Sequence, residues 1–162
     1  MSLSPLSRRI ALSALRLNGT KILWQKAIFC PGKRKDGTPC YDEESGSSYG
    51  LCKVCQGNGA IYKKGELIYG VYTDNSNQYQ VDPSGGFMMG EKTLSLPYWL
   101  PISLLKQRSG EGDFGRRLLR DRFTLISPQG KPTEILYLKQ DPTKPTIGSE
   151  TIYQIATVSN ND

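Results

Sequence analysis

The chain has 162 residues, a formal net charge of +6 and 37% hydrophobic residues, and it contains no histidine. A chain of this length forms one ordinary domain, with or without a small appendage, and buries about 70% of its unfolded surface. The lack of histidine excludes Ser-His-Asp and Cys-His nucleophilic machinery, and no glycine-rich phosphate loop is present. No apolar run approaches the roughly 18 residues of a membrane-spanning helix. We therefore expect a soluble protein, made in the cytoplasm, that is not an enzyme.

Residues 5–17 are expected to form a short helix. Ser4 suits the N-cap, Pro5 suits the first helical position, and Asn18-Gly19 suits the end. Apolar residues at helical spacing predict its packing face: Leu6, Ile10, Ala14 and Leu17. A helix this short is marginal alone, so we expect this face to pack either on its own domain or on a neighbouring subunit.

A strand predicted over residues 20–29 runs directly into the first of four cysteines. The cysteines are confined to a window of 26 residues: Cys30, Cys40, Cys52 and Cys55. The last two form a C-x-x-C motif followed by Gly57 and Gly59, which is typical of a metal knuckle. Such a turn aims both sulfurs at one point, and the glycines allow positive φ. Cys30-Pro31-Gly32-Lys33 begins like a second knuckle without its second cysteine, so Cys40 must supply that ligand.

Four thiolates fill the tetrahedral shell of Zn²⁺ and leave no open position for substrate or water. The motif therefore predicts a structural zinc held by Cys30, Cys40, Cys52 and Cys55. Two disulfides, free thiols and an iron–sulfur cluster remain open as alternatives. Disulfides are disfavoured in the reducing compartment that we expect, and iron–sulfur clusters usually take tighter cysteine spacings. A redox C-x-x-C would normally open a helix, whereas glycines follow this one.

The rest of the chain predicts a β fold. Residues 41–51 are expected to be a polar loop, and strands are expected over residues 67–72, 78–81, 87–89, 92–96, 122–126, 134–138 and 151–158. Strands at this spacing are typical of an antiparallel barrel or small sandwich. The predicted fold is mainly β, a small antiparallel β-barrel with a short N-terminal helix and an inserted four-cysteine zinc module. The expected parts are the helix and first strand (1–29), the metal-binding insertion (30–62) and the barrel (63–162).

A long, glycine-rich, charged loop is expected over residues 101–121. Its cations are candidates for contact with DNA phosphates: Lys106, Arg108, Arg116, Arg117 and Arg120. Residues 1–30 carry five further cations and no acid. A solvated face or a disordered loop would have the same composition, so both alternatives stay open.

The order of parts and several short motifs resemble a known family. The motifs are Tyr79-Gln80-Val81, Gly85-Gly86-Phe87, Gly90-Glu91-Lys92-Thr93-Leu94-Ser95-Leu96-Pro97 and Arg120-Asp121-Arg122-Phe123. Together with the N-terminal helix, they resemble the small β-barrel proteins of tailed-bacteriophage necks, of the head-closure or stopper type. Some members of that family have a C-x-x-C-x-G-x-G insertion after the first strand, which here corresponds to Cys52 to Gly59.

The resemblance implies a structural virion protein of the neck, which connects head to tail and helps to retain packaged DNA. It implies a homo-oligomeric ring, six- or twelve-fold, in contact with portal or adaptor and tail terminator proteins. Packaged double-stranded DNA would be contacted without sequence specificity, and no membrane would be involved. The main alternative is a zinc-containing, OB-like nucleic-acid-binding module that acts as a monomer. Related tail-completion or baseplate barrels, and a thiol oxidoreductase at Cys52 and Cys55, are further alternatives.

Overall fold

The computed structural model describes residues 4–42, 45, 47–81, 84, 87–104, 119–147 and 150–160. This part of the chain contains one helix, α1 (Ser4–Asn18), and is otherwise mainly β. Six strands form a barrel: β1 (Thr20–Gln25), β6 (Glu66–Asp74), β9 (Lys92–Pro97), β10 (Arg122–Ile126), β11 (Pro132–Leu138) and β14 (Tyr153–Ser159). Eight short strands pair outside it: β2 (Ala27–Phe29), β3 (Tyr41–Asp42), β4 (Ser47–Ser48), β5 (Ala60–Tyr62), β7 (Tyr79–Val81), β8 (Phe87–Met89), β12 (Thr146–Ile147) and β13 (Glu150–Thr151). Within the described residues, no helix is both long and apolar enough to cross a membrane.

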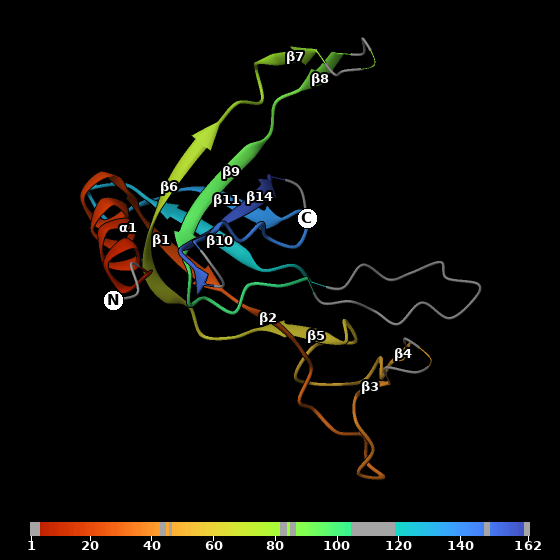
Figure 1. Cartoon of the computed structure of the whole chain (residues 1–162). Helices are drawn as coiled ribbons and strands as arrows, with labels where there is room; N and C mark the ends of the chain where they lie inside the picture. The colour runs from red at the N-terminus through yellow and green to blue at the C-terminus, as the bar shows by residue number, and fades with distance from the viewer. Residues whose placement is uncertain are drawn as a thin grey trace.

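The barrel is closed by antiparallel pairing in the order β1-β10-β11-β14-β9-β6, with β6 returning to β1 (Figure 1). In chain order it consists of two three-stranded meanders, β1-β6-β9 and β10-β11-β14. The meanders join through the β1–β10 and β9–β14 pairs. Every barrel strand has two neighbours, but the β11–β14 seam is short, with the pairs Tyr137↔Ser159 and Leu138↔Val158. The predicted mainly β fold with a small antiparallel barrel is confirmed.

Alternate residues of the barrel strands fill its interior, as the pleat of a strand requires. The buried side chains are Ile22, Trp24, Ile68, Leu94, Leu96, Phe123, Leu125, Leu136, Leu138, Ala156 and Val158. Leu100 and Ile102, which follow β9, join the same core. At Gly70 of β6, a Cβ atom would lie 2.9 Å from the backbone carbonyl oxygen of Ser95 and 2.8 Å from Leu96 Cδ2, so this close approach favours glycine.

Two boundaries differ from the sequence prediction. The single strand expected over residues 20–29 is two strands, because pairing changes partner at Lys26, from β6 to β5. The polar loop expected over residues 41–51 contains β3 and β4, and Tyr41 within it is buried. That burial arises because Tyr41 stacks on Phe29, with ring centroids 4.8 Å apart, a contact between residues distant in the sequence.

Helix α1 forms where it was predicted, but the predicted apolar face does not pack on its own domain, and its expected contact with a neighbouring subunit stays a prediction. Leu15 is the buried side chain of α1, on the side that packs against β6 and β9. Leu6, Ile10 and Leu17 are instead exposed by 59%, 61% and 83%, and Ala14 is also exposed. The apolar residues do have helical spacing, but the side of the helix that faces the barrel is the one that carries Leu15.

Arg8 fixes the helix from a second position. Its guanidinium lies 4.2 Å from the centre of the Tyr98 ring, and its Nε donates a hydrogen bond of 2.9 Å to the carbonyl of Thr151. Its Nη1 also lies 3.4 Å from a carboxylate oxygen of Glu150. The helix is therefore held by one apolar anchor and one cation with three partners.

Two β-hairpins project from opposite ends of the barrel (Figure 1). One is the β7–β8 hairpin, which continues the β6–β9 pair. The other, residues 27–62, continues the β1–β6 pair through β2 and β5, and we call it the cysteine arm. The arm is therefore the elaborated tip of a barrel hairpin.

Asp121 secures the junction between the arm and the barrel. Its buried carboxylate accepts hydrogen bonds from the Ala27 amide at 2.9 Å and the Trp24 indole at 3.2 Å. The Lys26 ammonium lies 3.7 Å from the same carboxylate. Burial raises the pKa of Asp121, whereas these partners oppose that rise.

Candidate metal centre

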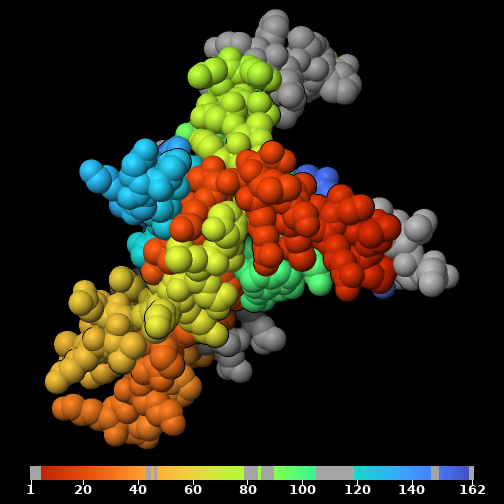
Figure 2. All heavy atoms as spheres, turned by 90° about the vertical axis from the view of Figure 1, so that its left-hand side faces the viewer, coloured from red at the N-terminus to blue at the C-terminus, as the bar shows by residue number. Residues whose placement is uncertain are grey.

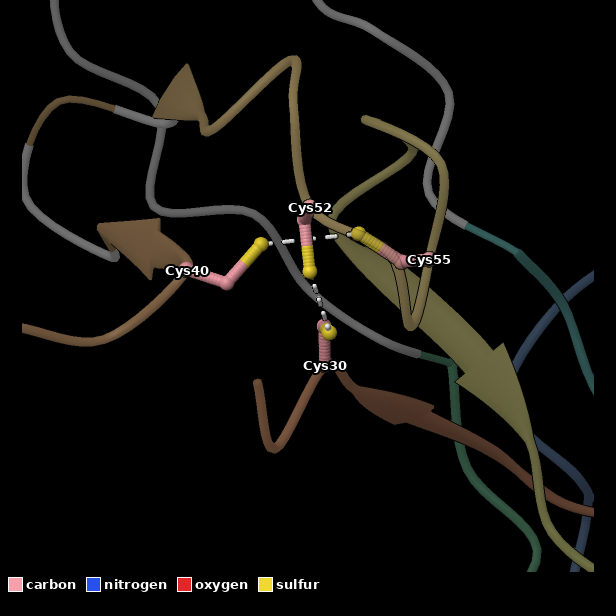
Figure 3. Close-up of side chains that lie close together, drawn as sticks. All are labelled: Cys30, Cys40, Cys52 and Cys55. Atoms are coloured by element: carbon pink, nitrogen blue, oxygen red, sulfur yellow. Dashed lines mark hydrogen bonds between the residues drawn. The ribbon is translucent and has the colours of Figure 1, made fainter. Parts of the chain in front are cut away.

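The cysteine arm gathers all four cysteine sulfurs at one place. The Sγ atoms of Cys30, Cys40, Cys52 and Cys55 all lie within 4.8 Å of one another, and all four side chains are buried. Figure 3 shows them pointing toward a common centre from separate segments of the arm. None of them forms a disulfide.

The sulfur spacing suits a tetrahedral metal site. With a Zn–S bond of about 2.3 Å, the edge of an ideal tetrahedron of sulfurs is about 3.8 Å. The Cys30–Cys52 and Cys40–Cys55 sulfur distances are 3.7 Å and 3.5 Å. A disulfide needs about 2.05 Å between its sulfurs, which is much shorter than these distances. The sulfurs are instead separated as they would be around a zinc ion. The site therefore fits a metal ion, and a soft donor set of four thiolates favours zinc or an iron–sulfur centre.

The first pair of cysteines is brought together by a small hairpin that stands between them. Lys33 and Pro39 form an antiparallel bridge, and the Arg34 amide donates to the Thr38 carbonyl at 2.8 Å. The Cys40 amide then donates to the carbonyl of Gly32 at 2.8 Å. The nine residues between Cys30 and Cys40 are thus folded back, and Cys40 occupies the place of the missing knuckle cysteine.

The second pair lies on a tight turn, as its sequence predicts. The Gln56 amide donates to the Cys52 carbonyl at 2.9 Å, and the chain then passes through positive φ at Gln56, Gly57 and Gly59. The predicted role of the two glycines is confirmed, and no helix follows the C-x-x-C. Gln56 has a φ of 53°, a left-handed conformation that the sequence did not indicate.

Backbone amides point at the sulfurs and favour their thiolate forms. The Gly32 amide lies 3.3 Å from Cys30 Sγ, and the Gly59 amide lies 3.3 Å from Cys55 Sγ. Hydrogen bonds from the backbone of Cys55 and Val54 lower the pKa of Cys52 to about 6. Amide donors of this kind stabilise negative charge on the sulfur without competing for the metal-facing lone pairs.

Burial acts in the opposite direction on the first pair of cysteines. It raises the pKa of Cys40 to about 12 and also raises the pKa of Cys30, because desolvation penalises the thiolate. A divalent cation at the centre would reverse this balance, since it stabilises a neighbouring thiolate directly. The arrangement therefore suits a bound cation better than four free thiols.

The sulfurs are themselves the centre of the arm's core. Among the described residues, the partly buried apolar side chains packed on them are Tyr49 and Ile61. Beside the cluster, an open cavity of about 690 Å³ is lined by Phe29, Cys30 and Tyr41 among others. Besides the stack of Phe29 on Tyr41 and the small buried side chains of Ala27 and Ala60, the sulfur cluster is the main packed centre of the described part of the arm.

The sequence did not single out Gly32 as part of the centre. Besides donating to Cys30, Gly32 lies so close to the cluster that a Cβ atom there would be 2.8 Å from Cys52 Sγ. The Cys-Pro-Gly start of a knuckle was its only sequence signal. Tyr49 was also missed; its amide donates to the Cys40 carbonyl and its carbonyl accepts from the Cys52 amide, which links the two cysteine pairs.

The candidate DNA-contacting cations are not brought into a site by the described residues. Lys106, Arg108, Arg116 and Arg117 lie outside the described residues, as does most of the loop predicted over 101–121. Arg120 is described, and it lies half-buried immediately before Asp121.

No protein-family model matches the chain, and no curated protein matches it.

Proposed function

We propose that the cysteine arm binds one Zn²⁺ through Cys30, Cys40, Cys52 and Cys55 and that this zinc is structural. The observation that carries the proposal is the mutual proximity of four buried sulfurs, all within 4.8 Å. Four protein ligands complete a tetrahedral shell, so the metal would have no open position for a substrate. The metal's role would be to fold the arm.

We further propose that the chain is a structural subunit of a tailed-phage neck, in a ring that connects head to tail. The resemblance of its motifs and the order of helix, strand, insertion and barrel support this. The exposed apolar side chains of α1 also support an assembly, since Leu6, Ile10 and Leu17 gain no burial on their own barrel. The two projecting hairpins offer further surface to neighbours (Figure 1). Contacts to portal, adaptor or tail terminator proteins, and to packaged DNA through Lys106, Arg108, Arg116, Arg117 and Arg120, belong to the same proposal.

The OB-like nucleic-acid-binding module is less well supported. An OB fold is a five-stranded, partly open barrel, whereas this barrel is closed by six strands. The thiol oxidoreductase is also less well supported, because all four thiols are buried.

Native mass spectrometry of the purified chain, repeated after denaturation, tests both proposals. One zinc mass per chain together with six or twelve chains is the expected result. A metal-free chain would contradict the zinc proposal, and iron with inorganic sulfide would replace it with a cluster. A zinc-bearing chain that stays monomeric even with its neck neighbours present would contradict the ring. Ile10→Glu should weaken the oligomer and leave the zinc mass unchanged, because Ile10 is exposed and lies on the helix rather than in the arm.

A further inference from the structure

Two grooves flank the exposed indole of Trp99, on the face of the molecule that carries α1. The first groove, of about 240 Å³, lies between α1 and the barrel, and the second, of about 260 Å³, lies toward the base of the cysteine arm. Trp99 lines both grooves, so they form one continuous surface, which we call the Trp99 surface. Figure 2 shows this face, with α1 in red, β6 in yellow-green and the segment after β9 in green.

The first groove is apolar. Its walls include Leu12 and Leu15 of α1, Leu67 and Tyr69 of β6, and Trp99. Leu67 is 61% exposed and Trp99 is 52% exposed, so these side chains leave apolar area that the chain itself does not cover. Contiguous exposed apolar area beside a hollow is typical of a binding surface for another protein.

Cations border this apolar groove. Arg16 lines it from the helix. Lys21 is exposed and lies directly opposite Tyr69 in the β1–β6 pair, and directly paired residues share a face of the sheet. A ligand in the groove would therefore meet positive charge at its edge.

The second groove continues the positive charge. Lys63 and Lys64, both exposed, line it together with Lys26, and Glu66 is the acid among its described lining residues. The Lys26 ammonium is already engaged, since it lies 3.3 Å from the Ser103 hydroxyl and 3.7 Å from a carboxylate oxygen of Asp121. Lys63 and Lys64 are therefore the positive charges that this groove presents to a ligand, and exposed Glu66 offsets one of them.

The backbone on both sides of Trp99 is fixed between the two grooves. The side-chain Nε2 of buried Gln154 lies 3.0, 3.0 and 2.7 Å from the carbonyl oxygens of Pro97, Tyr98 and Leu100, which share its two N–H groups. Leu100, the next residue, is buried in the barrel core. The turn that presents the indole is thus fixed in advance, which lowers the entropic cost of binding through it.

We infer that the Trp99 surface binds an acidic, apolar-anchored segment of a partner protein. Apolar side chains of the segment occupy the groove between α1 and β6, and its carboxylates meet Lys63 and Lys64 beyond Trp99. This inference concerns the barrel surface and depends on neither the zinc nor the ring.

Charge and shape favour this occupant over two others. A two-fold contact between copies of the chain would place this surface, with Arg16, Lys21, Lys63 and Lys64, against an identical positively charged surface, which costs free energy. Single-stranded nucleic acid would need successive aromatic platforms, whereas the walls beside Trp99 include the aliphatic Leu12 and Leu67. An acidic protein segment satisfies both grooves at once.

A yeast-displayed library of random 16-residue peptides, selected against the full zinc-loaded chain, provides the probe. We expect the enriched peptides to combine apolar residues with net negative charge and to bind less tightly as salt increases. Trp99→Ala should weaken their binding by about tenfold or more, as for central aromatic anchors. Lys63→Glu combined with Lys64→Glu should weaken it comparably. Leu67→Ser provides a second test of the apolar groove at an exposed strand position, in case Trp99→Ala perturbs the turn.

Matched controls come from elsewhere on the barrel. Ile135→Ala removes another exposed apolar side chain, and Lys131→Glu reverses another exposed charge, and neither should affect peptide binding. Enriched peptides that are neutral or basic, or that bind Leu67→Ser and the double lysine variant as tightly as the wild type, would overturn the inference. So would a failure to enrich any peptide, a Trp99-dependent dimer in sedimentation, or Trp99-dependent binding of an oligothymidine. If the chain is monomeric but binds such peptides as expected, this inference stands and the ring proposal fails.

Discussion

The cysteine arm continues a hairpin of the barrel, yet the two regions are stabilised by different interactions. The barrel gives each of its six strands two neighbours and buries a large set of aliphatic and aromatic side chains. The arm pairs only short strands, and its core combines four sulfurs, with Tyr49 and Ile61 beside them, and the stack of Phe29 on Tyr41. Hydrophobic burial is the main stabilising force in the barrel, whereas the arm has less apolar area, and under the zinc proposal the bound metal supplies the rest of its stability. If the arm binds zinc as proposed, one chain combines a domain that folds by itself with a segment that folds only with its metal.

Metal removal should separate the two regions most clearly. Binding at a structural four-thiolate site supplies on the order of 10 kcal/mol, so chelation should unfold residues 30–60 and leave the barrel folded. Hydrogen exchange followed by mass spectrometry should show fast exchange across the arm. Peptides from β9 and β14 serve as the internal control and should stay protected. Loss of protection in these barrel strands would show that the two regions are not independent.

The converse experiment weakens the barrel and spares the metal. Phe123 is fully buried in the barrel core, and Phe123→Ala should lower the free energy of unfolding by about 3–5 kcal/mol through lost burial and the cavity left behind. Urea unfolding monitored by tryptophan fluorescence measures this, and Ile135→Ala, at an exposed barrel position, should change it little. The folded variant should still carry one metal ion per chain. A metal-free but folded Phe123→Ala protein would contradict the proposed independence.

A smaller effect should appear at Gly32, where the arm's backbone touches the sulfurs. The added methyl group of Gly32→Ala would lie 2.8 Å from Cys52 Sγ and disturb the amide that donates to Cys30. Changes of this kind beside a metal ligand typically lower affinity by about 10–100-fold. Competition with a chromophoric chelator measures it. Gly50→Ala in the same arm is the matched control, because nothing lies within 4 Å of its Cβ position. Equal zinc affinities for the two variants would rule out this role for Gly32.

The smallest expected effect concerns a surface ion pair that ties the barrel strands. Lys92 Nζ of β9 lies 2.9 Å from Glu134 Oε1 of β11, and both side chains are partly exposed. Burial raises the pKa of Glu134, but hydrogen bonds from Asn160 and Lys92 outweigh it, so the pKa lies below its ordinary value. Lys92→Met should therefore cost roughly 1 kcal/mol at pH 7.

The pH dependence of that cost follows from the lowered pKa. A carboxylate whose pKa is lower in the folded than in the unfolded protein stabilises the fold when the pH lies above its pKa in the unfolded state. This stabilisation is lost as the pH falls through its pKa in the folded state. The difference in melting temperature between wild type and Lys92→Met should thus shrink as the pH falls below 4.5, the ordinary value for Glu134. Lys139→Met removes the cation of an exposed pair with Glu91, and its melting temperature should differ little from that of the wild type both at pH 7 and below pH 4.5. A difference that persists in acid would point to a packing effect of the Lys92 stem.

Local signals in the sequence predicted much of this molecule. Ser4, Pro5 and Gly19 bounded the helix correctly, and the C-x-x-C with Gly57 and Gly59 predicted a turn that the structure confirms. These predictions succeeded because capping, turn chemistry and chelate spacing depend on residues a few positions apart. The order of strands around the barrel could not be obtained in this way, since it depends on pairings such as β1 with β10, about a hundred residues apart.

The helix face and the junction show what local reasoning could not decide. Leu6, Ile10 and Leu17 have the spacing of a buried face, but which side a helix buries is decided by the surface that it meets. Asp121 resembled one more charge in a basic segment, yet it is buried because Trp24 and Ala27 bring donors to it from the first hairpin. Nothing in the sequence around Trp99 indicated that its indole would be half exposed, because that exposure depends on where α1 and β6 lie.

The attachment of the cysteine arm has a consequence for how such proteins can be built and altered. The chain leaves the barrel at Lys26 and returns at Lys63, and these two residues are joined by a backbone hydrogen bond of 2.8 Å. Entry and exit are therefore adjacent, and the intervening segment is a cassette whose removal requires only a short turn in its place. The same geometry makes the segment graftable, because any antiparallel hairpin presents two ends at this spacing. If the arm binds zinc as proposed, a metal-dependent surface can in this way be gained or lost without redesign of the barrel beneath it.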